Sequence, residues 1–172
     1  MQWNNGGSCA SGSNDKRKVG GDKVKIRYGN LIEIAHEYDV IVHGCNCFNT
    51  MGAGFARQVA RNWPDAEYVD SLTTKGAVSK LGKISMSPFV YDTRGVFVVV
   101  NAYTQFDYRG DSMRVSYEAV GSCFEQVAAL FPDKRIAYPK IGAGLGGGDW
   151  GVISQIIDKE LDGADHTLVL LS

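Results

Sequence analysis

The sequence has little of several features that mark particular classes of protein. Its 172 residues include four cysteines and three histidines, with no C-x-x-C and His at zinc spacing, so we expect no metal site. Eighteen Lys and Arg against nineteen Asp and Glu leave a net charge of -1, which disfavours general nucleic-acid binding. No apolar run approaches the ~20 residues of a membrane helix, and a signal-peptide stretch is missing. We therefore expect a cytoplasmic protein with no membrane partner.

The length suits one domain preceded by a tail. Residues 1–22 are rich in Gly, Ser, Asn and basic side chains, with little to bury, so a flexible N-terminal tail is expected there. Residues 23–172 alternate short β-rich runs with stretches of helical period and contain no internal repeat. This segment is of ordinary domain size, and we predict a single folded domain.

Six strands and four helices are predicted in this domain. The runs 40–42 and 96–100 are continuously apolar, as expected of interior strands covered on both faces. The predicted strands span 24–28, 40–43, 83–87, 96–101, 135–138 and 167–171, and the predicted helices span 54–63, 64–73, 113–131 and 150–161. Such alternation predicts an α/β fold, a three-layer α/β/α sandwich around a mixed, mostly parallel six-stranded sheet. Ligands of such sheets bind where strands end and loops lead to helices.

Two glycine-rich loops each follow a predicted strand and precede a predicted helix. Residues 43–56 read HGCNCFNTMGAGFA, and residues 139–150 read PKIGAGLGGGDW. Glycine lets backbone N–H groups approach a ligand closely, and consecutive N–H groups at a helix start form an anion site. Two such loops on one sheet edge suit a pyrophosphate, held by amides without an excess of Lys or Arg.

Two other phosphate-binding motifs fail. Gly142, Gly144 and Gly147 satisfy G-x-G-x-x-G, but a dinucleotide site also needs an acidic residue at the end of the following strand. Here Asp165 lies before the last predicted strand and not at its end. This glycine loop also comes near the end of the chain, whereas in a dinucleotide-binding domain it follows the first strand. The sequence also lacks G-x-x-x-x-G-K-[ST]. These patterns exclude redox use of NAD and a P-loop ATPase, and we expect no cofactor.

The motifs together resemble the macrodomain family, the ADP-ribose-binding fold, over nearly all of residues 24–171. The resemblance rests on the Tyr28-Gly29-Asn30-Leu31 turn, on H-x-x-N with M-G-A-G-F-A in the first loop, and on G-L-x-x-x-x-W in the second. The most similar branch includes ADP-ribose 1''-phosphate phosphatases of phages and bacteria and terminal ADP-ribose protein glycohydrolases. The resemblance implies a monomer whose partner is ADP-ribose or a derivative of it.

The resemblance also implies the site residues. Asn30 and Leu31 would lie at the adenine, where the Asn oxygen can accept the hydrogen bond that the family's usual Asp accepts. Tyr103 follows the central strand and would stack on adenine, close over ribose, or pack within its loop. The implied ligand-binding residues are Asn30, Leu31, Gly52, Ala53, Gly54, Phe55, Tyr103, Gly142, Ala143, Gly144, Leu145, Gly146 and Gly147.

Two departures bear on activity. The glycohydrolases of this branch have Asp where this chain has Gly146, and a Lys near the end of the central strand, where this chain reads NAYTQ over 101–105. We therefore do not expect lysine-dependent removal of ADP-ribose from protein carboxylates. The second loop instead resembles the phosphatase-like members, which predicts hydrolysis of ADP-ribose 1''-phosphate to ADP-ribose and phosphate.

Three side chains are candidate catalytic groups. Asn46 would face the distal ribose and orient it or a water molecule. His43 is either a general acid or base or a buried histidine satisfied by the backbone. Asp149 either activates water or caps the helix that follows it. Two other functions stay open: a non-catalytic module that binds ADP-ribose, and a deacetylase of O-acetyl-ADP-ribose.

Overall fold

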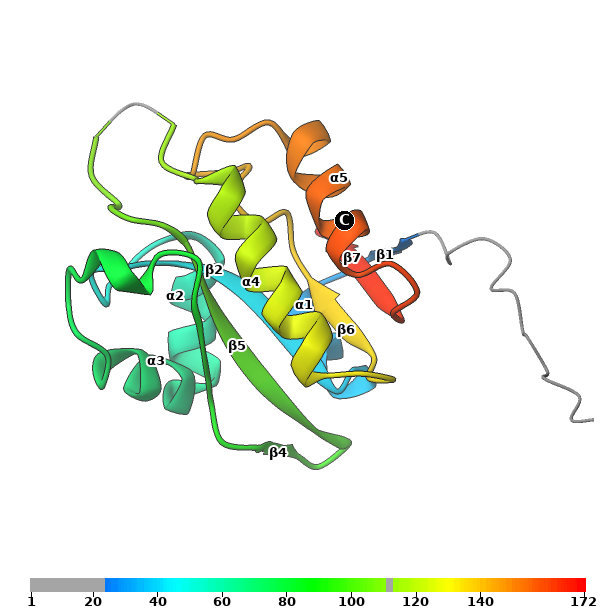
Figure 1. Ribbon diagram of the computed structural model, residues 1–172. Helices are drawn as coiled ribbons and strands as arrows, with labels where there is room; N and C mark the ends of the chain where they lie inside the picture. The colour runs from blue at the N-terminus through cyan, green and yellow to red at the C-terminus, as the bar shows by residue number, and fades with distance from the viewer. Residues whose placement is uncertain (1–23, 111–112) are drawn as a thin grey trace, which may run out of the picture.

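A computed structural model describes residues 24–110 and 113–172 (Figure 1). The predicted tail, residues 1–22, lies outside the described residues. The strands are β1 Lys25–Tyr28, β2 Val40–Asn46, β3 Ile84–Met86, β4 Val90–Asp92, β5 Gly95–Gln105, β6 Ile136–Tyr138 and β7 His166–Leu170. The helices are α1 Leu31–Ile34, α2 Gly54–Asn62, α3 Pro64–Ser71, α4 Tyr117–Leu130 and α5 Trp150–Glu160, with 3-10 turns η1 Ala35–Glu37 and η2 Val78–Lys80.

The strands form one mixed sheet in the order β1-β7-β6-β2-β5-β3, and β4 pairs with β5 beside this path. Neighbouring strands are parallel along the path β1-β7-β6-β2-β5, whereas β3 and β4 run antiparallel to β5. The predicted mixed, mostly parallel sheet is confirmed, and β4 adds a strand to the six predicted. Because β2, β5 and β6 are parallel, their carboxyl ends meet at one edge, where both glycine loops emerge.

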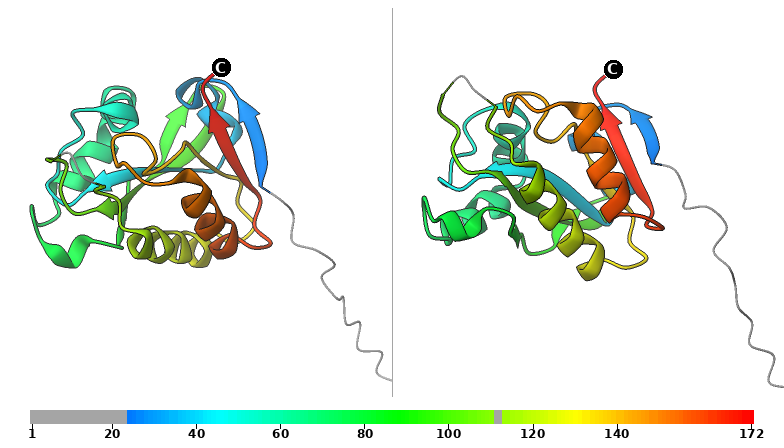
Figure 2. Two further views of the ribbon diagram at one scale, coloured as in Figure 1. Left: turned by 90° about the horizontal axis from the view of Figure 1, so that it is seen from above. Right: turned by 45° about the horizontal axis from the view of Figure 1, so that its top comes forward.

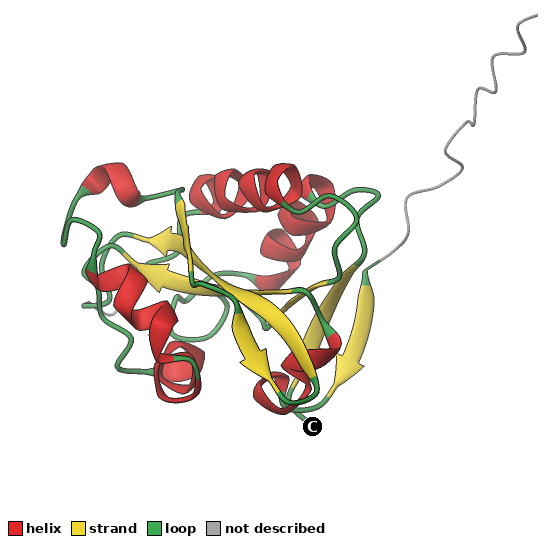
Figure 3. Ribbon diagram, turned by 90° about the horizontal axis from the view of Figure 1, so that it is seen from below, coloured by secondary structure: helices red, strands yellow, loops and turns green. Residues whose placement is uncertain are grey.

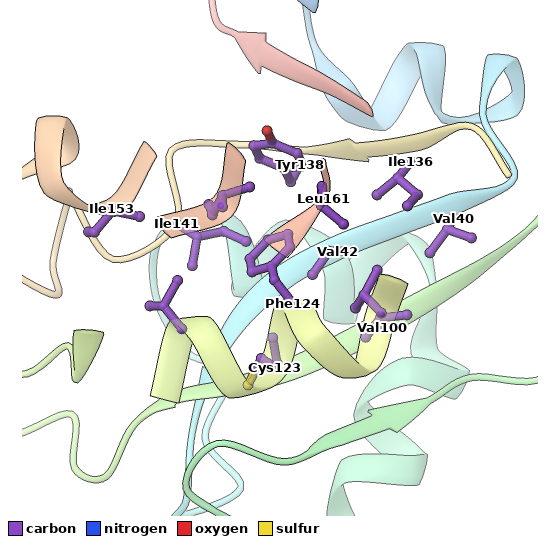
Figure 4. Packing of buried hydrophobic residues seen from close by; sticks show 14 of the residues in the cluster. Val40, Val42, Val100, Cys123, Phe124, Ile136, Tyr138, Ile141, Ile153 and Leu161 are labelled. Atoms are coloured by element: carbon purple, nitrogen blue, oxygen red, sulfur yellow. The ribbon is translucent and has the colours of Figure 1, made fainter. Parts of the chain in front are cut away.

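Helices cover both faces of the sheet (Figures 1–3). The helices α4 and α5 lie side by side on one face, and Phe124, Ile153 and Leu161 pack there against β2, β5 and β6 (Figure 4). On the other face, Trp63 and Val59 from the α2 region pack against the sheet, together with residues of α1 and α3. In the part of the chain that the structure describes, no helix is long and apolar enough to cross a membrane.

The predicted start of the third helix at residue 113 was wrong. Val115 forms a β-bridge with Gln105, and the Ser116 side chain caps α4 by accepting a hydrogen bond from Ala119 N at 3.2 Å. The helix therefore begins at Tyr117, after a capping residue that favours non-helical backbone. As a consequence, residues 113–116 run as an extended segment beside the second glycine loop, where Arg114 N donates to Gly146 O at 2.8 Å.

Candidate functional site

The two glycine loops border one cavity of about 670 Å³ at the carboxyl edge of the sheet. A second cavity of about 440 Å³ adjoins it, and Gly54, Phe55, Pro139 and Lys140 line both. The volumes are those of small-molecule sites. Among the predicted residues, the first cavity is lined by Asn46, Gly52, Ala53, Gly54, Phe55, Gly142, Gly144, Leu145 and Gly146. The second is lined by Asn30, Leu31, Gly54 and Phe55.

The first loop leads into an open helix start. Gly54, the first residue of α2, has φ +57°, a left-handed conformation that favours glycine. The residue before it, Ala53, has no polar side chain, and α2 has no side-chain cap. The first N–H groups of a helix have no partner inside the helix, and the helix dipole adds partial positive charge there. Ala53, Gly54 and Phe55 line the cavity, and a helix start of this kind is suited to binding an anion.

The second loop folds tightly on itself. Gly147 N donates to Gly144 O at 3.0 Å, and Gly148 N donates to Gly142 O at 2.9 Å. A Cβ added at Gly146 would lie 2.6 Å from Gly142 O, so a side chain at position 146 does not fit this turn. The compact turn is therefore a physical reason for glycine at the position where the branch's glycohydrolases have Asp.

The helix after the second loop differs from α2. The Asp149 carboxylate caps α5, with Oδ1 accepting from Gly151 N at 2.6 Å and from Val152 N at 3.3 Å. The backbone N–H of Asp149 donates to the Tyr117 hydroxyl at 3.1 Å. The capping interpretation of Asp149 therefore agrees with the geometry, and the helix start that opens into the cavity is that of α2.

Both charged side chains that line the first cavity, Arg114 and Lys140, are cations. Arg114 is half-buried, and its guanidinium donates to Tyr108 O at 2.7 Å. Its buried Nε has no hydrogen-bond partner among the described residues. The cavity therefore has positive character from both side chains and amides, which suits an anionic ligand.

Sequence reasoning missed both cations. Lys140 lies two residues beyond the end of β6, so the rule that ligands bind at strand ends could have identified it. Arg114 was missed because residues 113–131 were predicted to form a helix, which gave no reason to expect residue 114 at a loop edge.

Asn46 is the candidate catalytic side chain that lines the cavity. Its Nδ2 donates to Thr50 O at 2.8 Å, and its Oδ1 accepts from Phe48 N at 2.9 Å. These bonds fix the side chain within its own loop while its edge faces the cavity. The predicted residues His43, Tyr103, Ala143, Gly147 and Asp149 line neither cavity.

His43 lies behind the cavity, in the interior of β2, and is 1% exposed. Asn101 Nδ2 donates to Ala66 O at 2.9 Å and to Ser85 Oγ at 3.1 Å, so its Oδ1 is the acceptor for His43 Nε2 at 2.7 Å. Burial lowers the pKa of His43 to about 4, against the opposing effect of the Asn101 hydrogen bond. His43 is therefore a neutral side chain that ties β2 to β5 at neutral pH.

The low pKa of His43 predicts a loss of stability in acid. An unfolded histidine has a pKa near 6.5, so the neutral form stabilises the fold fully above that pH and progressively less toward pH 4. This group alone is expected to lower the free energy of unfolding by about 3 kcal/mol between pH 6.5 and 4. Urea unfolding of the wild type and of His43→Gln across this range measures it; parallel pH profiles for the two proteins would contradict it. The pKa of buried His166 is also lowered by burial, so the variant retains part of the slope.

The described residues hold no cluster of three or more His, Cys, Asp or Glu that could bind a metal ion. The cysteines of the first loop are buried, and burial raises the pKa of both Cys45 and Cys47. Such thiols stay protonated at neutral pH and are poor nucleophiles. The groups at the cavity that can contact a ligand therefore include backbone amides, Asn46 and the two cations.

Comparison with known proteins identifies the fold. No family model matches the chain. An uncharacterized 17.5 kDa protein from the tk-vs intergenic region of Enterobacteria phage T4 is 35% identical over 140 residues, which cover 78% of this chain and 88% of that protein. A macrodomain protein from Streptomyces coelicolor superposes with a TM-score of 0.62 and 25% identity over 85% of this chain and 99% of that one. The chain has the macrodomain fold and is related to other macrodomain proteins.

Two further relatives of this macrodomain have described ligands or activities. A DNA ADP-ribosyl glycohydrolase from Mycobacterium tuberculosis is 27% identical over 133 residues, which cover 76% of this chain and 37% of that protein. The structure of Thermosipho africanus DarTG in complex with ADP-ribose superposes with a TM-score of 0.65 and 15% identity, over 86% of the macrodomain and 42% of that chain. At that identity the likeness concerns the fold.

Proposed function

We propose that this macrodomain binds ADP-ribose across its two adjoining cavities. The observation that carries the proposal is the uncapped start of α2, which opens into a cavity lined by two cations. A diphosphate above this helix start would receive backbone N–H hydrogen bonds and lie within the field of the helix dipole. Glycohydrolase relatives and the ADP-ribose complex of a fold relative support the same ligand.

We assign the parts of the ligand to the two cavities by the residues that line each of them. The adenine and its ribose would occupy the cavity lined by Asn30 and Leu31. Asn30 Oδ1 already accepts from Ile32 N at 3.1 Å, and its second lone pair would accept from the adenine amine. The distal ribose would lie between Asn46 and the second loop, with the diphosphate at the shared wall formed by Gly54 and Phe55.

The second candidate function is hydrolysis of ADP-ribose 1''-phosphate, and Arg114 favours it. The Arg114 backbone bonds to the second loop and the residue lines the first cavity, where a terminal phosphate would supply acceptor oxygens to the guanidinium. Phosphoryl transfer depends mainly on positioning and charge stabilisation, which amides, Asn46 and a guanidinium can provide. In this hydrolysis the oxygen of water would form a bond to phosphorus while the bond between phosphorus and the 1'' oxygen breaks. A proton from that water would end on the 1'' oxygen, which gives ADP-ribose and inorganic phosphate.

An assay with three substrates tests the catalytic proposal. The macrodomain is incubated with ADP-ribose 1''-phosphate, with O-acetyl-ADP-ribose and with ADP-ribosylated DNA, alongside Asn46→Ala. Phosphate release by the wild type, reduced by about 10-fold or more in Asn46→Ala, is the expected result. Activity on the acetyl ester or DNA alone would instead assign a deacetylase or a glycohydrolase. Binding of ADP-ribose without turnover of any substrate would assign a non-catalytic module.

A further inference from the structure

The first glycine loop is attached to a buried polar network on the side of the loop away from the cavity. Asn49, in the middle of the loop, has φ +55° and projects its amide toward the end of α3. Its Nδ2 donates to Asp70 O at 2.6 Å and to Thr73 O at 3.0 Å, and its Oδ1 accepts from Lys80 Nζ at 2.7 Å. One side chain thus joins the loop to two separate segments.

The network continues beneath the loop through an ion pair. Lys80 Nζ lies 3.5 Å from Asp70 Oδ1, with their side chains 8% and 2% exposed. The same ammonium lies 4.5 Å from the centre of the Tyr103 ring, and the Tyr103 hydroxyl donates to Asp70 Oδ1 at 2.9 Å. Burying charged groups is costly unless they are paired and hydrogen-bonded, and these charges meet that condition. Tyr103, whose predicted place was at the ligand, belongs to this network.

A short path joins the network to the cavity. The residue after Asn49 is Thr50, whose carbonyl oxygen accepts the hydrogen bond from Asn46 Nδ2 at 2.8 Å. Fixing Asn49 therefore fixes the Thr50 carbonyl, which in turn sets the orientation of the Asn46 side chain in the cavity wall. Two backbone bonds support the same loop, from Gly76 N to Cys47 O at 2.7 Å and from Cys47 N to Phe106 O at 2.9 Å.

We propose that Asn49, Lys80 and Asp70 are positioning residues that hold the first loop in the shape required for the distal ribose of the ligand. They touch no ligand themselves, since none of the three lines either cavity. This inference rests on the proposed function, which puts the distal ribose beside Asn46. It predicts an effect confined to the distal part of the ligand, because Asn46, Thr50 and Gly52 of this loop line the first cavity but not the second.

The test compares two ligands on one variant. Asn49→Gly removes the amide but keeps the positive φ that the position needs. Calorimetry with ADP-ribose and with AMP, which would occupy the second cavity, gives two affinities for each protein. We expect Asn49→Gly to lose about tenfold in affinity for ADP-ribose and to bind AMP as the wild type does. Asn49→Asp keeps the acceptor for Lys80 but loses the donor, so its affinity for ADP-ribose should lie between those of the wild type and Asn49→Gly. The same comparison is made with Asn49→Asp if the glycine variant does not fold.

A matched control separates positioning from general loss of stability. Asp39 accepts three hydrogen bonds from Arg135, at the opposite end of β2 from the first loop. Asp39→Ala should lower the melting temperature and leave both affinities unchanged. Equal losses for ADP-ribose and AMP in Asn49→Gly, or no loss for either, would overturn the positioning role. A wild type that binds neither ligand would overturn the proposed function, and this inference with it.

Discussion

Replacing Gly54 by valine is expected to lower the affinity for ADP-ribose by at least about 100-fold. Gly54 has φ +57°, where a β-branched residue is strongly disfavoured. It is also the first residue of α2 and lines both cavities, so a valine side chain would occupy space beside the proposed diphosphate site. A Cβ at this position would lie 3.5 Å from Leu145 Cδ1 of the second loop, an ordinary van der Waals distance, so the strain comes from the φ angle and not from the Cβ itself.

The control for Gly54→Val is a second left-handed glycine remote from the cavities. Gly163 has φ +77° and lies between α5 and β7. Gly163→Val should impose comparable backbone strain and lower the melting temperature, yet bind ADP-ribose as the wild type does. Calorimetry and thermal unfolding of both variants measure the two effects. A Gly54→Val protein that is folded and binds normally would remove the helix start from the ligand site.

Replacing Lys80 by methionine is expected to lower the free energy of unfolding by about 3 kcal/mol. Methionine keeps the length of the side chain but removes the charge, and Asp70 would then be left as a buried carboxylate without its cation. The Tyr103 hydroxyl would remain as a hydrogen-bond donor to Asp70, so the expected loss is at the lower end for a broken buried pair. Asn49 would also lose the donor to its Oδ1.

Two further variants give this prediction its controls. Lys159 pairs with Glu160 at 2.9 Å on the surface, with its side chain 80% exposed, so Lys159→Met should cost less than about 0.5 kcal/mol. Adding Asp70→Asn to Lys80→Met removes the unpaired charge and should recover part of the lost stability. Denaturant unfolding of the four proteins measures the differences. A Lys80→Met protein as stable as Lys159→Met would show that the buried ion pair contributes nothing to the fold.

The fold followed from local patterns that needed no long-range information. The continuous apolar runs at 40–42 and 96–100 lie in the interior strands β2 and β5, and both glycine loops follow strands, as predicted. Strand and loop order then determines which ends of the strands meet, because parallel strands share one carboxyl edge. The short strand β4, Val90–Asp92, was missed because three residues with an exposed tyrosine carry no clear β pattern.

The parts of the site that depend on contacts distant in the sequence were not predictable. Asn49 meets Lys80 across 31 positions, and Tyr103 meets Asp70 across 33, so no spacing rule connects them. In the sequence, a histidine at a strand end is compatible with a catalytic or a structural role, and burial together with the Asn101 hydrogen bond favours the structural role for His43. Similarly, Asp149 is visible as a carboxylate in a glycine loop, but its engagement with Gly151 N depends on the local turn.

Titration calorimetry of the purified chain with ADP-ribose at neutral pH tests the central claim most directly. The account predicts saturable binding of one ADP-ribose per chain. The affinity should be lower in Gly54→Val, and the wild type should bind ligands without the diphosphate more weakly than ADP-ribose. Absence of saturation with millimolar ADP-ribose, in a sample whose circular dichroism and cooperative melting show a folded protein, would contradict it.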